Sequence, residues 1–222
     1  MLLELDRPLA HTRYEFQLQL ANPINVHRLE FDMVPEYARV LDVGCHTGIL
    51  GEALAQHKQA HVIGIDADSV ALAQAAKRLA GVALVDLWQP GWEAEVEAMG
   101  WTRFDTIIFG DVLEHTPHPD RVLRAARTLL APRGNIIVSL PNIAYWRIRL
   151  GLLRGNFDYT DSGILDRTHL KFFTASSART LIEEAGYRIT RHEISGFTLP
   201  PALIRCFPRL LGFQNVFEAV IT

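Results

Sequence analysis

Two acids and a histidine stand close together near the middle of the chain, and their side chains are of the types that move protons or bind cations. Asp111, Glu114 and His115 directly follow the apolar run 104–109. A histidine has a reference pKa near 6.5, which suits a general base at neutral pH. A hydrogen bond from the imidazole to the backbone is the alternative role for such a loop histidine. Its position directly after a predicted strand favours a part in catalysis.

A glycine-rich turn is the second feature with chemical meaning. In the run 40–51, apolar residues flank Asp42, glycines follow at positions 44 and 48, and a helix-compatible stretch comes next. This order is typical of a buried strand that turns sharply into a helix. Because Gly44 and Gly48 have no Cβ, the backbone there can approach a nucleoside cofactor closely. On its own such a turn is a weak signal, since it also serves to pack a helix on a sheet.

Aspartates stand at the ends of the next predicted strands. Asp66 follows the run 60–65, Asp86 follows 82–85, and Asp111 takes the same place after 104–109. In an open parallel sheet, ligands bind outside the carboxyl ends of the strands. A carboxylate at Asp66 can accept hydrogen bonds from both ribose hydroxyls, and one at Asp86 can accept from an exocyclic amine. Capping of a helix is the alternative for any one of them, but three acids behind one glycine turn favour a nucleoside site.

The elements that must position these residues alternate between strands and helices. Strands are predicted over 39–44, 60–65, 82–85, 104–109 and 135–140, with helices reaching to about 57 and spanning 69–79 and 121–130, the last ending at Pro132-Arg133-Gly134. This rhythm predicts an α/β fold with a parallel sheet covered on both faces. A helix over 175–185 and strands over 188–194 and 214–221 complete the chain.

The chain is expected to form one domain, with charge and length typical of a globular protein. It has 222 residues, of which 49% are hydrophobic and 21% charged, and no apolar run approaches the roughly 20 residues that span a bilayer. The first residues lack the basic start of a signal peptide, and the two cysteines are far apart, so a cytoplasmic location is expected. The parts are an N-terminal cap (1–37), a cofactor-binding core (38–140), a substrate lid (141–173) and a C-terminal helix with strands (174–222).

The glycine turn and the three aspartates together resemble the class I S-adenosylmethionine-dependent methyltransferases, over most of residues 38–195. The resemblance implies a Rossmann-like, seven-stranded, mostly parallel sheet whose last strand is antiparallel, with a small lid after strand five. It also implies that the turn faces the methionine end of the cofactor. His46 stands where the family usually has a third glycine. Gly44-Cys45-His46-Thr47-Gly48 lacks the G-x-G-x-x-G spacing of a nicotinamide enzyme. The residues expected to bind S-adenosylmethionine are Asp42, Gly44, Cys45, His46, Gly48, Asp66, Ala67, Asp86, Leu87, Gly110 and Asp111.

Asp111-x-x-Glu114-His115 with a distant Thr168-His169 looks like the ubiquinone-biosynthesis O-methyltransferases. It is also similar to the small-RNA 2′-O-methyltransferases, where such residues hold a metal near the target hydroxyl. The resemblance implies His115, Glu114 and His169 as catalytic residues, acting through a general base or through a divalent ion that lowers the pKa of a hydroxyl. Asp rather than Glu stands at the first position, so Asp111 is equally suited to the cofactor site.

The segment after the fifth predicted strand carries a second resemblance. Residues 139–150 are similar to the methionine-biosynthesis W-type proteins, and residues 161–174 look like a bacterial methyltransferase group linked with glycosyltransferases and surface polysaccharides. Tyr145, Trp146 and Tyr159, with Arg147, offer a stacking face and a positive charge for a sugar or an anionic acceptor; packing within the lid is the alternative for the aromatics. The Trp/Arg/Leu mixture, with the apolar segment 197–213, also fits a transient contact with a membrane surface.

Two classes of function follow from these features. The first is an O-methyltransferase for a small molecule, a saccharide or a lipid-linked hydroxyl. The alternative is a partner protein that binds S-adenosylmethionine and regulates another enzyme; a partner protein of this kind has no need of His115 and His169. A pI near 6.3 and the lack of a broad basic, aromatic surface argue against nucleic acid as the substrate. The sequence is silent on oligomeric state.

Overall fold

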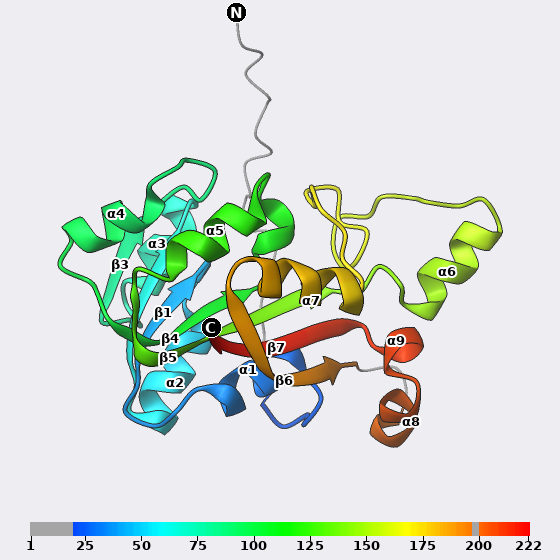
Figure 1. The fold of residues 1–222 in the computed structure, drawn as a ribbon, viewed down its shortest axis with the longest axis horizontal. Coiled ribbons are helices and arrows are strands. Elements are labelled where there is room, and N and C mark those ends of the chain that lie inside the picture. The colour runs from blue at the N-terminus through cyan, green and yellow to red at the C-terminus, as the bar shows by residue number, and fades with distance from the viewer. Residues whose placement is uncertain (1–19, 197–199) are drawn as a thin grey trace, which may run out of the picture.

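The computed structural model describes residues 20–196 and 200–222, and its centre is one seven-stranded sheet (Figure 1). The order of the strands is β3-β2-β1-β4-β5-β7-β6. The first five strands of this order are parallel, and β7 runs antiparallel to both β5 and β6. This is the Rossmann-like architecture predicted from the sequence. The strands are β1 (Arg39–Val43), β2 (His61–Asp66), β3 (Gly81–Leu84), β4 (Phe104–Gly110), β5 (Leu130–Pro141), β6 (Tyr187–Ser195) and β7 (Gln214–Ile221).

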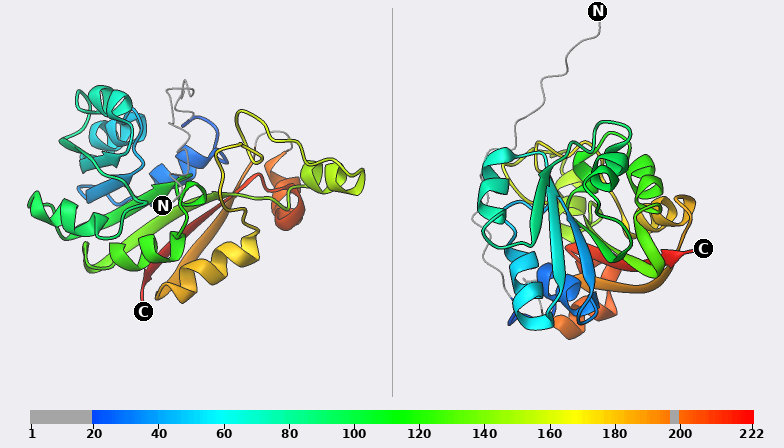
Figure 2. Two further views of the ribbon diagram at one scale, coloured as in Figure 1. Left: turned by 90° about the horizontal axis from the view of Figure 1, so that it is seen from above. Right: turned by 90° about the vertical axis from the view of Figure 1, so that its left-hand side faces the viewer.

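Helices cover both faces of the sheet because successive side chains of each strand point to opposite sides. Leu41 and Val43 belong to one apolar core with α4, α5 and α7, whereas Val40 belongs to the other core with α1, α2 and α3. Figure 2 shows the two layers from two directions. The covering helices are α1 (Val26–Met33), α2 (Ile49–Lys58), α3 (Ser69–Ala75), α4 (Trp92–Ala98), α5 (Pro119–Ala126) and α7 (Ala175–Glu184).

The connection into β5 differs from the sequence prediction. The helix expected over 121–130 ends at Ala126, and β5 begins at Leu130 and runs through Pro132-Arg133-Gly134, which was expected to end that helix. Phe104 of β4 pairs with Leu130, but Thr106 pairs with Asn135, so the extra residues form a bulge. The prediction was wrong because Pro and Gly are typical of loops and also of bulges.

Two helices also differ from their expected extents. The helix predicted over 69–79 ends at Ala75, and α4 was not predicted. Trp92 and Val96 of α4 are spaced by one helical turn, and both are buried against the sheet. This short spacing was visible in the sequence, but three glutamates among its seven residues obscured the apolar stripe.

The region expected to be an N-terminal cap contains α1, while residues 1–19 lie outside the described part of the chain. The Asn25 side chain caps the helix by accepting a hydrogen bond from the His27 N–H at 3.0 Å. Val26, Leu29 and Met33 are buried on the same face of the sheet as α2 and α3. The remaining buried residue of that helix face is an acid, Glu30.

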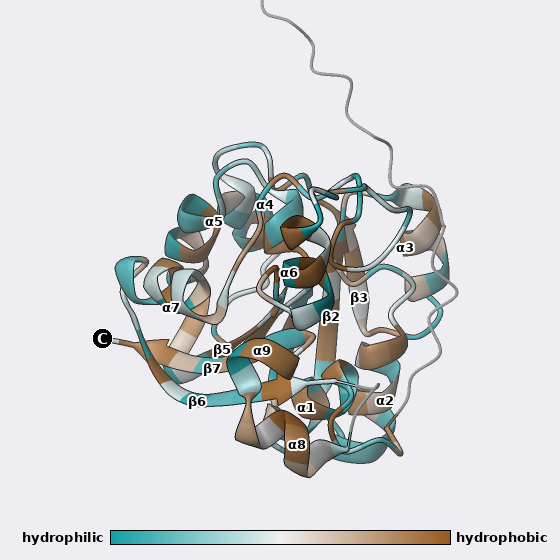
Figure 3. Cartoon of the chain, turned by 90° about the vertical axis from the view of Figure 1, so that its right-hand side faces the viewer, coloured by the Kyte–Doolittle hydropathy of each residue, from teal (hydrophilic) through white to brown (hydrophobic). Residues whose placement is uncertain are grey.

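The segment between β5 and α7 is closed at its base and extends outward. Asn142 pairs with Phe173 in a short parallel bridge, and its side-chain amide donates to the Gly212 carbonyl at 2.9 Å. Between these ends, α6 (Trp146–Leu153) protrudes from the body of the molecule (Figure 2). Helices α8 (Pro201–Cys206) and α9 (Pro208–Leu211) lie at the same end (Figure 3), within the predicted apolar segment 197–213, whose first three residues are not described. None of the helices described is long and apolar enough to cross a membrane.

Candidate functional site

The turn between β1 and α2 requires glycine at two positions. Gly44 has φ +73° and Gly48 has φ +76°, and both values lie in the region that side chains rarely adopt. A Cβ on Gly44 would come within 2.7 Å of Val112 Cγ2, so the turn and the loop after β4 are in close contact. His46 also has a positive φ, +47°. Glycine adopts this backbone conformation without strain, whereas histidine does not.

Asp66 holds the turn in place through both carboxylate oxygens. Its Oδ2 accepts a hydrogen bond from the His46 N–H at 2.8 Å, and its Oδ1 accepts from the Asp68 N–H at 2.8 Å. Asp66 is only partly buried, so its oxygens keep access to a ligand. The acid predicted to meet a ribose therefore also shapes the glycine turn.

The other residues predicted to bind the cofactor line the same edge of the sheet. Asp42, in β1, is buried, and burial together with the negative charge of Asp66 raises its pKa to about 7. Asp86 follows β3 and accepts a hydrogen bond from the Trp88 N–H at 3.0 Å. Trp88 Nε1 donates to the His115 carbonyl at 3.0 Å, which connects the predicted adenine side to the segment after β4. Cys45 is buried beside this turn, Ala67 is exposed, and Leu87 packs on the core.

Asp111 is turned toward β5 and β7. Its N–H donates to Ser139 Oγ at 2.9 Å, the Ser139 hydroxyl donates back to Asp111 Oδ1 at 3.1 Å, and the Gln214 amide donates to Oδ2. Burial raises the pKa of Asp111 to about 6, although both hydrogen bonds favour the charged form. Asp111 therefore does not join the group that Glu114, His115 and His169 form, and a metal site that includes its side chain is not assembled in this structure.

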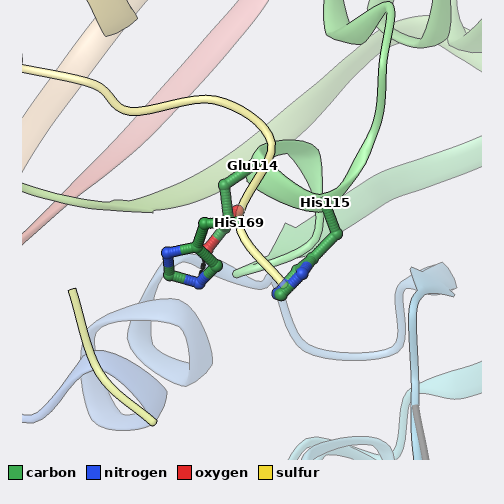
Figure 4. Close-up of side chains that lie close together, drawn as sticks. All are labelled: Glu114, His115 and His169. Atoms are coloured by element: carbon green, nitrogen blue, oxygen red, sulfur yellow. Dashed lines mark ion pairs between the residues drawn. The ribbon is translucent and has the colours of Figure 1, made fainter. Parts of the chain in front are cut away.

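Glu114, His115 and His169 do lie together (Figure 4). One ligand atom from each lies within 4.8 Å of the others. Glu114 and His115 come from a short 3₁₀ turn (Leu113–His115) after β4, whereas His169 comes from the end of the lid segment. The Leu170 N–H donates to the Glu114 carbonyl at 2.8 Å, so the backbone of the lid is fixed to the turn.

Backbone carbonyls determine which ring nitrogen of each histidine carries the proton. His115 Nδ1 lies 3.2 Å from the Thr168 carbonyl oxygen, and His169 Nδ1 lies 3.1 Å from the Ile164 carbonyl oxygen. A carbonyl only accepts, so each Nδ1 is protonated and each Nε2 presents a lone pair. His169 Nε2 faces Glu114 Oε1 at 4.0 Å.

Burial shifts the pKa values in this group toward neutral side chains. Burial lowers the pKa of His115, and burial with the neighbouring His115 charge lowers the pKa of His169 to about 4. Burial and the charge of Asp111 raise the pKa of Glu114 well above its usual range. Among the described residues, neither carboxylate oxygen of Glu114 receives a hydrogen bond. Side chains that burial shifts toward their neutral forms therefore lie within 4.8 Å of one another beside the end of β4.

Several residues of this site carried no signal in the sequence. Gln214 and Ser139 reach Asp111 from strands that are distant along the chain. Asp166 is buried, and its Oδ1 accepts a hydrogen bond from the Thr168 hydroxyl at 2.7 Å. This bond fixes Thr168, whose carbonyl positions His115.

The comparisons with known proteins agree with this fold. A family model described as a methyltransferase domain matches residues 14–192. The ubiquinone biosynthesis O-methyltransferase of Pseudomonas aeruginosa (strain UCBPP-PA14) is 31% identical over 209 residues, which are 87% of this chain and 84% of that protein. The protein of the same name from Coxiella burnetii (strain Dugway 5J108-111) is 34% identical over 125 residues, 56% of this chain and about half (53%) of the relative.

Solved structures show the same fold at low sequence identity. A SAM-dependent methyltransferase from Archaeoglobus fulgidus aligns with TM-score 0.60 and 16% identity, covering 86% of this chain and 89% of that one. Magnesium protoporphyrin IX methyltransferase from Synechocystis with bound SAM aligns with TM-score 0.55 and 19% identity, covering 89% of this chain and 76% of that one. The chain belongs to the methyltransferase domain family. The resemblance predicted from the sequence is thereby confirmed.

Proposed function

We propose that the protein transfers the methyl group of S-adenosylmethionine to a hydroxyl of a small molecule, a sugar or a lipid-linked saccharide. The observation that carries this proposal is the group formed by Glu114, His115 and His169 at the end of β4. Methyl transfer from a sulfonium is an in-line displacement of an already activated group, so the protein chiefly aligns the nucleophile and removes its proton. Two imidazole lone pairs at one point are suited to that task.

In this proposal His115 is the general base. Its Nδ1–H is held by the Thr168 carbonyl, so its Nε2 is free to take the proton of the acceptor hydroxyl as the C–O bond forms. The lowered pKa keeps the imidazole neutral before the reaction. The transferred methyl leaves S-adenosylhomocysteine with a neutral sulfur, and the proton stays on His115 until solvent removes it.

A divalent ion fits the same three side chains. Glu114 has two oxygens without a hydrogen-bond donor among the described residues, and each histidine presents Nε2 while its Nδ1 donates to a carbonyl, as metal-binding histidines do. Such an ion would supply a Lewis acid that lowers the pKa of a hydroxyl. Loss of activity on chelation, with recovery on addition of Mg²⁺ or Zn²⁺, would support the ion. Activity that resists chelation in protein free of metal would leave His115 as the base alone.

The surface of α6 supports an acceptor presented at an anionic membrane. None of its eight residues is buried. Trp146, Leu150 and Leu153 recur at helical spacing on one face and are 36%, 37% and 84% exposed. Arg147 and Arg154 are also exposed. Leu152 is 50% exposed on another face, so apolar side chains surround α6 and do not form a single stripe. Exposed tryptophan and leucine beside arginines support contact with a lipid interface.

The alternative, a regulatory partner that only binds the cofactor, is less well supported. A protein without chemistry would not need to hold two partly buried histidines beside the expected position of the methyl group, together with a buried acid whose side chain has no hydrogen bond in the described structure. A buried polar group without a hydrogen bond costs stability. The test is a screen of the purified protein with labelled S-adenosylmethionine against nucleotide sugars, quinone precursors and lipid-linked saccharides. A methyl ether in the product supports the proposal, and a methyl group on nitrogen or carbon would overturn it.

A further inference from the structure

Helix α1 carries an acid where its helical pattern requires an apolar residue. Glu30 is only 2% exposed and lies on the same face of the helix as Val26, Leu29 and Met33. One of its oxygens, Oε1, has no hydrogen-bond donor among the described residues. An ionised carboxylate in such a place is strongly disfavoured unless a cation or a set of donors compensates it.

The position of Glu30 is the carboxyl end of the central strands. A Cβ added to Gly110, the last residue of β4, would lie 3.0 Å from Glu30 Oε1, so the absence of a side chain there makes room for the carboxylate. Ser139, which pairs across from Gly110 in β5, donates its hydroxyl to Asp111, so no hydrogen bond from it to Glu30 is present in the described structure, although its side chain is near enough to oppose part of the rise in the pKa of Glu30. Glu30 thus enters the predicted cofactor site from the face that α1 covers.

The protein itself supplies only negative charge to this acid. In the described part of the chain, the charges that raise the pKa of Glu30 are those of Asp111 and Asp42, which add to the effect of burial. Glu114 in turn feels the charges of Asp111 and Glu30. Three buried acids (Glu30, Asp42 and Glu114) and the partly buried Asp111 extend from β1, where Asp42 lies, to the 3₁₀ turn that carries Glu114. A site of this kind is complementary to a cation that is absent from the protein.

S-adenosylmethionine has such a cation at its methionine end. Its sulfonium and its ammonium are both positive, whereas the product S-adenosylhomocysteine retains the ammonium and has a neutral sulfur. We propose that Glu30 is a cofactor-binding residue that, with Asp42 and Asp111, forms the counter-charge for the sulfonium and so selects the methyl donor over the demethylated product. This inference deepens the proposed function, because it uses the same site, but it concerns only the cofactor and does not depend on the acceptor.

Calorimetric binding of both ligands to Glu30→Gln tests the proposal. We expect the affinity for S-adenosylmethionine to fall about tenfold, equal to about 1.4 kcal/mol, while the affinity for S-adenosylhomocysteine falls by less than about threefold. Sinefungin, which carries a protonated amine near the place of the sulfonium, should follow S-adenosylmethionine. Equal losses of affinity for S-adenosylmethionine and S-adenosylhomocysteine, or no loss for either, would overturn the proposal.

Two further variants separate this role from a structural one. Met33→Leu changes a buried apolar residue of the same helix, and we expect it to leave the ratio of the two affinities unchanged. If Glu30→Gln does not fold, Gly110→Ala is the substitute, because its Cβ would lie 3.0 Å from Glu30 Oε1 and push the carboxylate away by a few tenths of an ångström. Gly110→Ala should reduce the ratio of the affinity for S-adenosylmethionine to that for S-adenosylhomocysteine. An unchanged ratio in this variant would reject the role of Glu30. If Glu30→Gln reduces this ratio as expected but the wild-type protein methylates no hydroxyl, the inference about Glu30 holds and the proposed O-methylation is refuted.

Discussion

The replacement Glu114→Gln separates chemistry from stability at the candidate site. Glu114 is 1% exposed, and neither of its oxygens has a donor in the described structure. An unsatisfied buried polar group costs about 1–3 kcal/mol. The amide of glutamine keeps the shape of the side chain and removes the ionisable group, whose charged form is disfavoured by burial and by Asp111. His169 Nε2 lies 4.0 Å from Oε1, beyond hydrogen-bond distance, so no bond is lost. We therefore expect the free energy of unfolding to rise by about 1 kcal/mol, which for a chain of this length raises Tm by about 2–4 °C.

The same replacement should nearly abolish turnover. Loss of a group that orients or activates the nucleophile typically costs roughly 10²-fold or more. Thermal unfolding by differential scanning fluorimetry, calorimetric binding of S-adenosylmethionine and initial rates on one preparation provide the three readouts. We expect higher Tm, unchanged cofactor affinity and a large loss of turnover.

Thr106→Val is the matched control in the core. Thr106 is fully buried, and its hydroxyl donates to Asn135 Oδ1 at 2.7 Å. Valine leaves that oxygen without its donor, so Tm should fall by the equivalent of about 1–3 kcal/mol while turnover per folded molecule stays the same. The two variants thus move stability in opposite directions. Normal turnover in Glu114→Gln, or a drop in its Tm as large as that of Thr106→Val, would show that Glu114 is a structural acid and refute the reasoning.

Three further predictions follow from the cofactor edge and the lid. Asp66→Ala should abolish S-adenosylmethionine binding in calorimetry and lower the free energy of unfolding, since the His46 N–H loses its acceptor. The control Asp68→Ala should lower the free energy of unfolding by only about 1 kcal/mol, through the loss of a helix cap. Unchanged affinity in Asp66→Ala contradicts the assignment of Asp66 to the cofactor site. The folded-state pKa of Asp42 is about 7 against 3.8, so its protonated form favours folding below about pH 4 and this contribution is lost as pH rises through 7. Asp42→Asn should therefore gain stability relative to the wild-type protein between pH 4 and pH 7 in denaturant unfolding; a constant difference would show that Asp42 is not perturbed. Trp146→Ala should weaken cosedimentation with phosphatidylglycerol vesicles about fivefold, and equal binding to neutral vesicles would argue against the anionic surface.

The fold could be predicted because its signals are local. Each strand from β1 to β4 is a short apolar run followed by an acid or a glycine, and both ends of β7 were placed correctly from its apolar pattern. The start of β5 could not be placed in this way. Its bulge depends on the register with β4, which is a tertiary property.

The candidate site was predictable in its residue types but not in its contacts. The position of His169 beside Glu114 depends on the path of the lid, and the protonation of His115 depends on the Thr168 carbonyl. Asp111 points away from the other three candidate ligands because Gln214 reaches it from β7, more than a hundred residues away in the sequence. Such pairings have no signature in one sequence, whereas Glu30 stands out as an acid among the apolar positions of α1.

The most direct test of the central claim, that the group after β4 performs the chemistry, is a paired measurement on His115→Ala. Calorimetry gives the affinity for S-adenosylmethionine, and transfer of labelled methyl to the acceptor found in the screen gives the turnover. We predict an affinity within about twofold of the wild-type protein and a turnover lower by roughly 10²-fold or more, the scale of a lost general base. Wild-type turnover in His115→Ala would contradict the account.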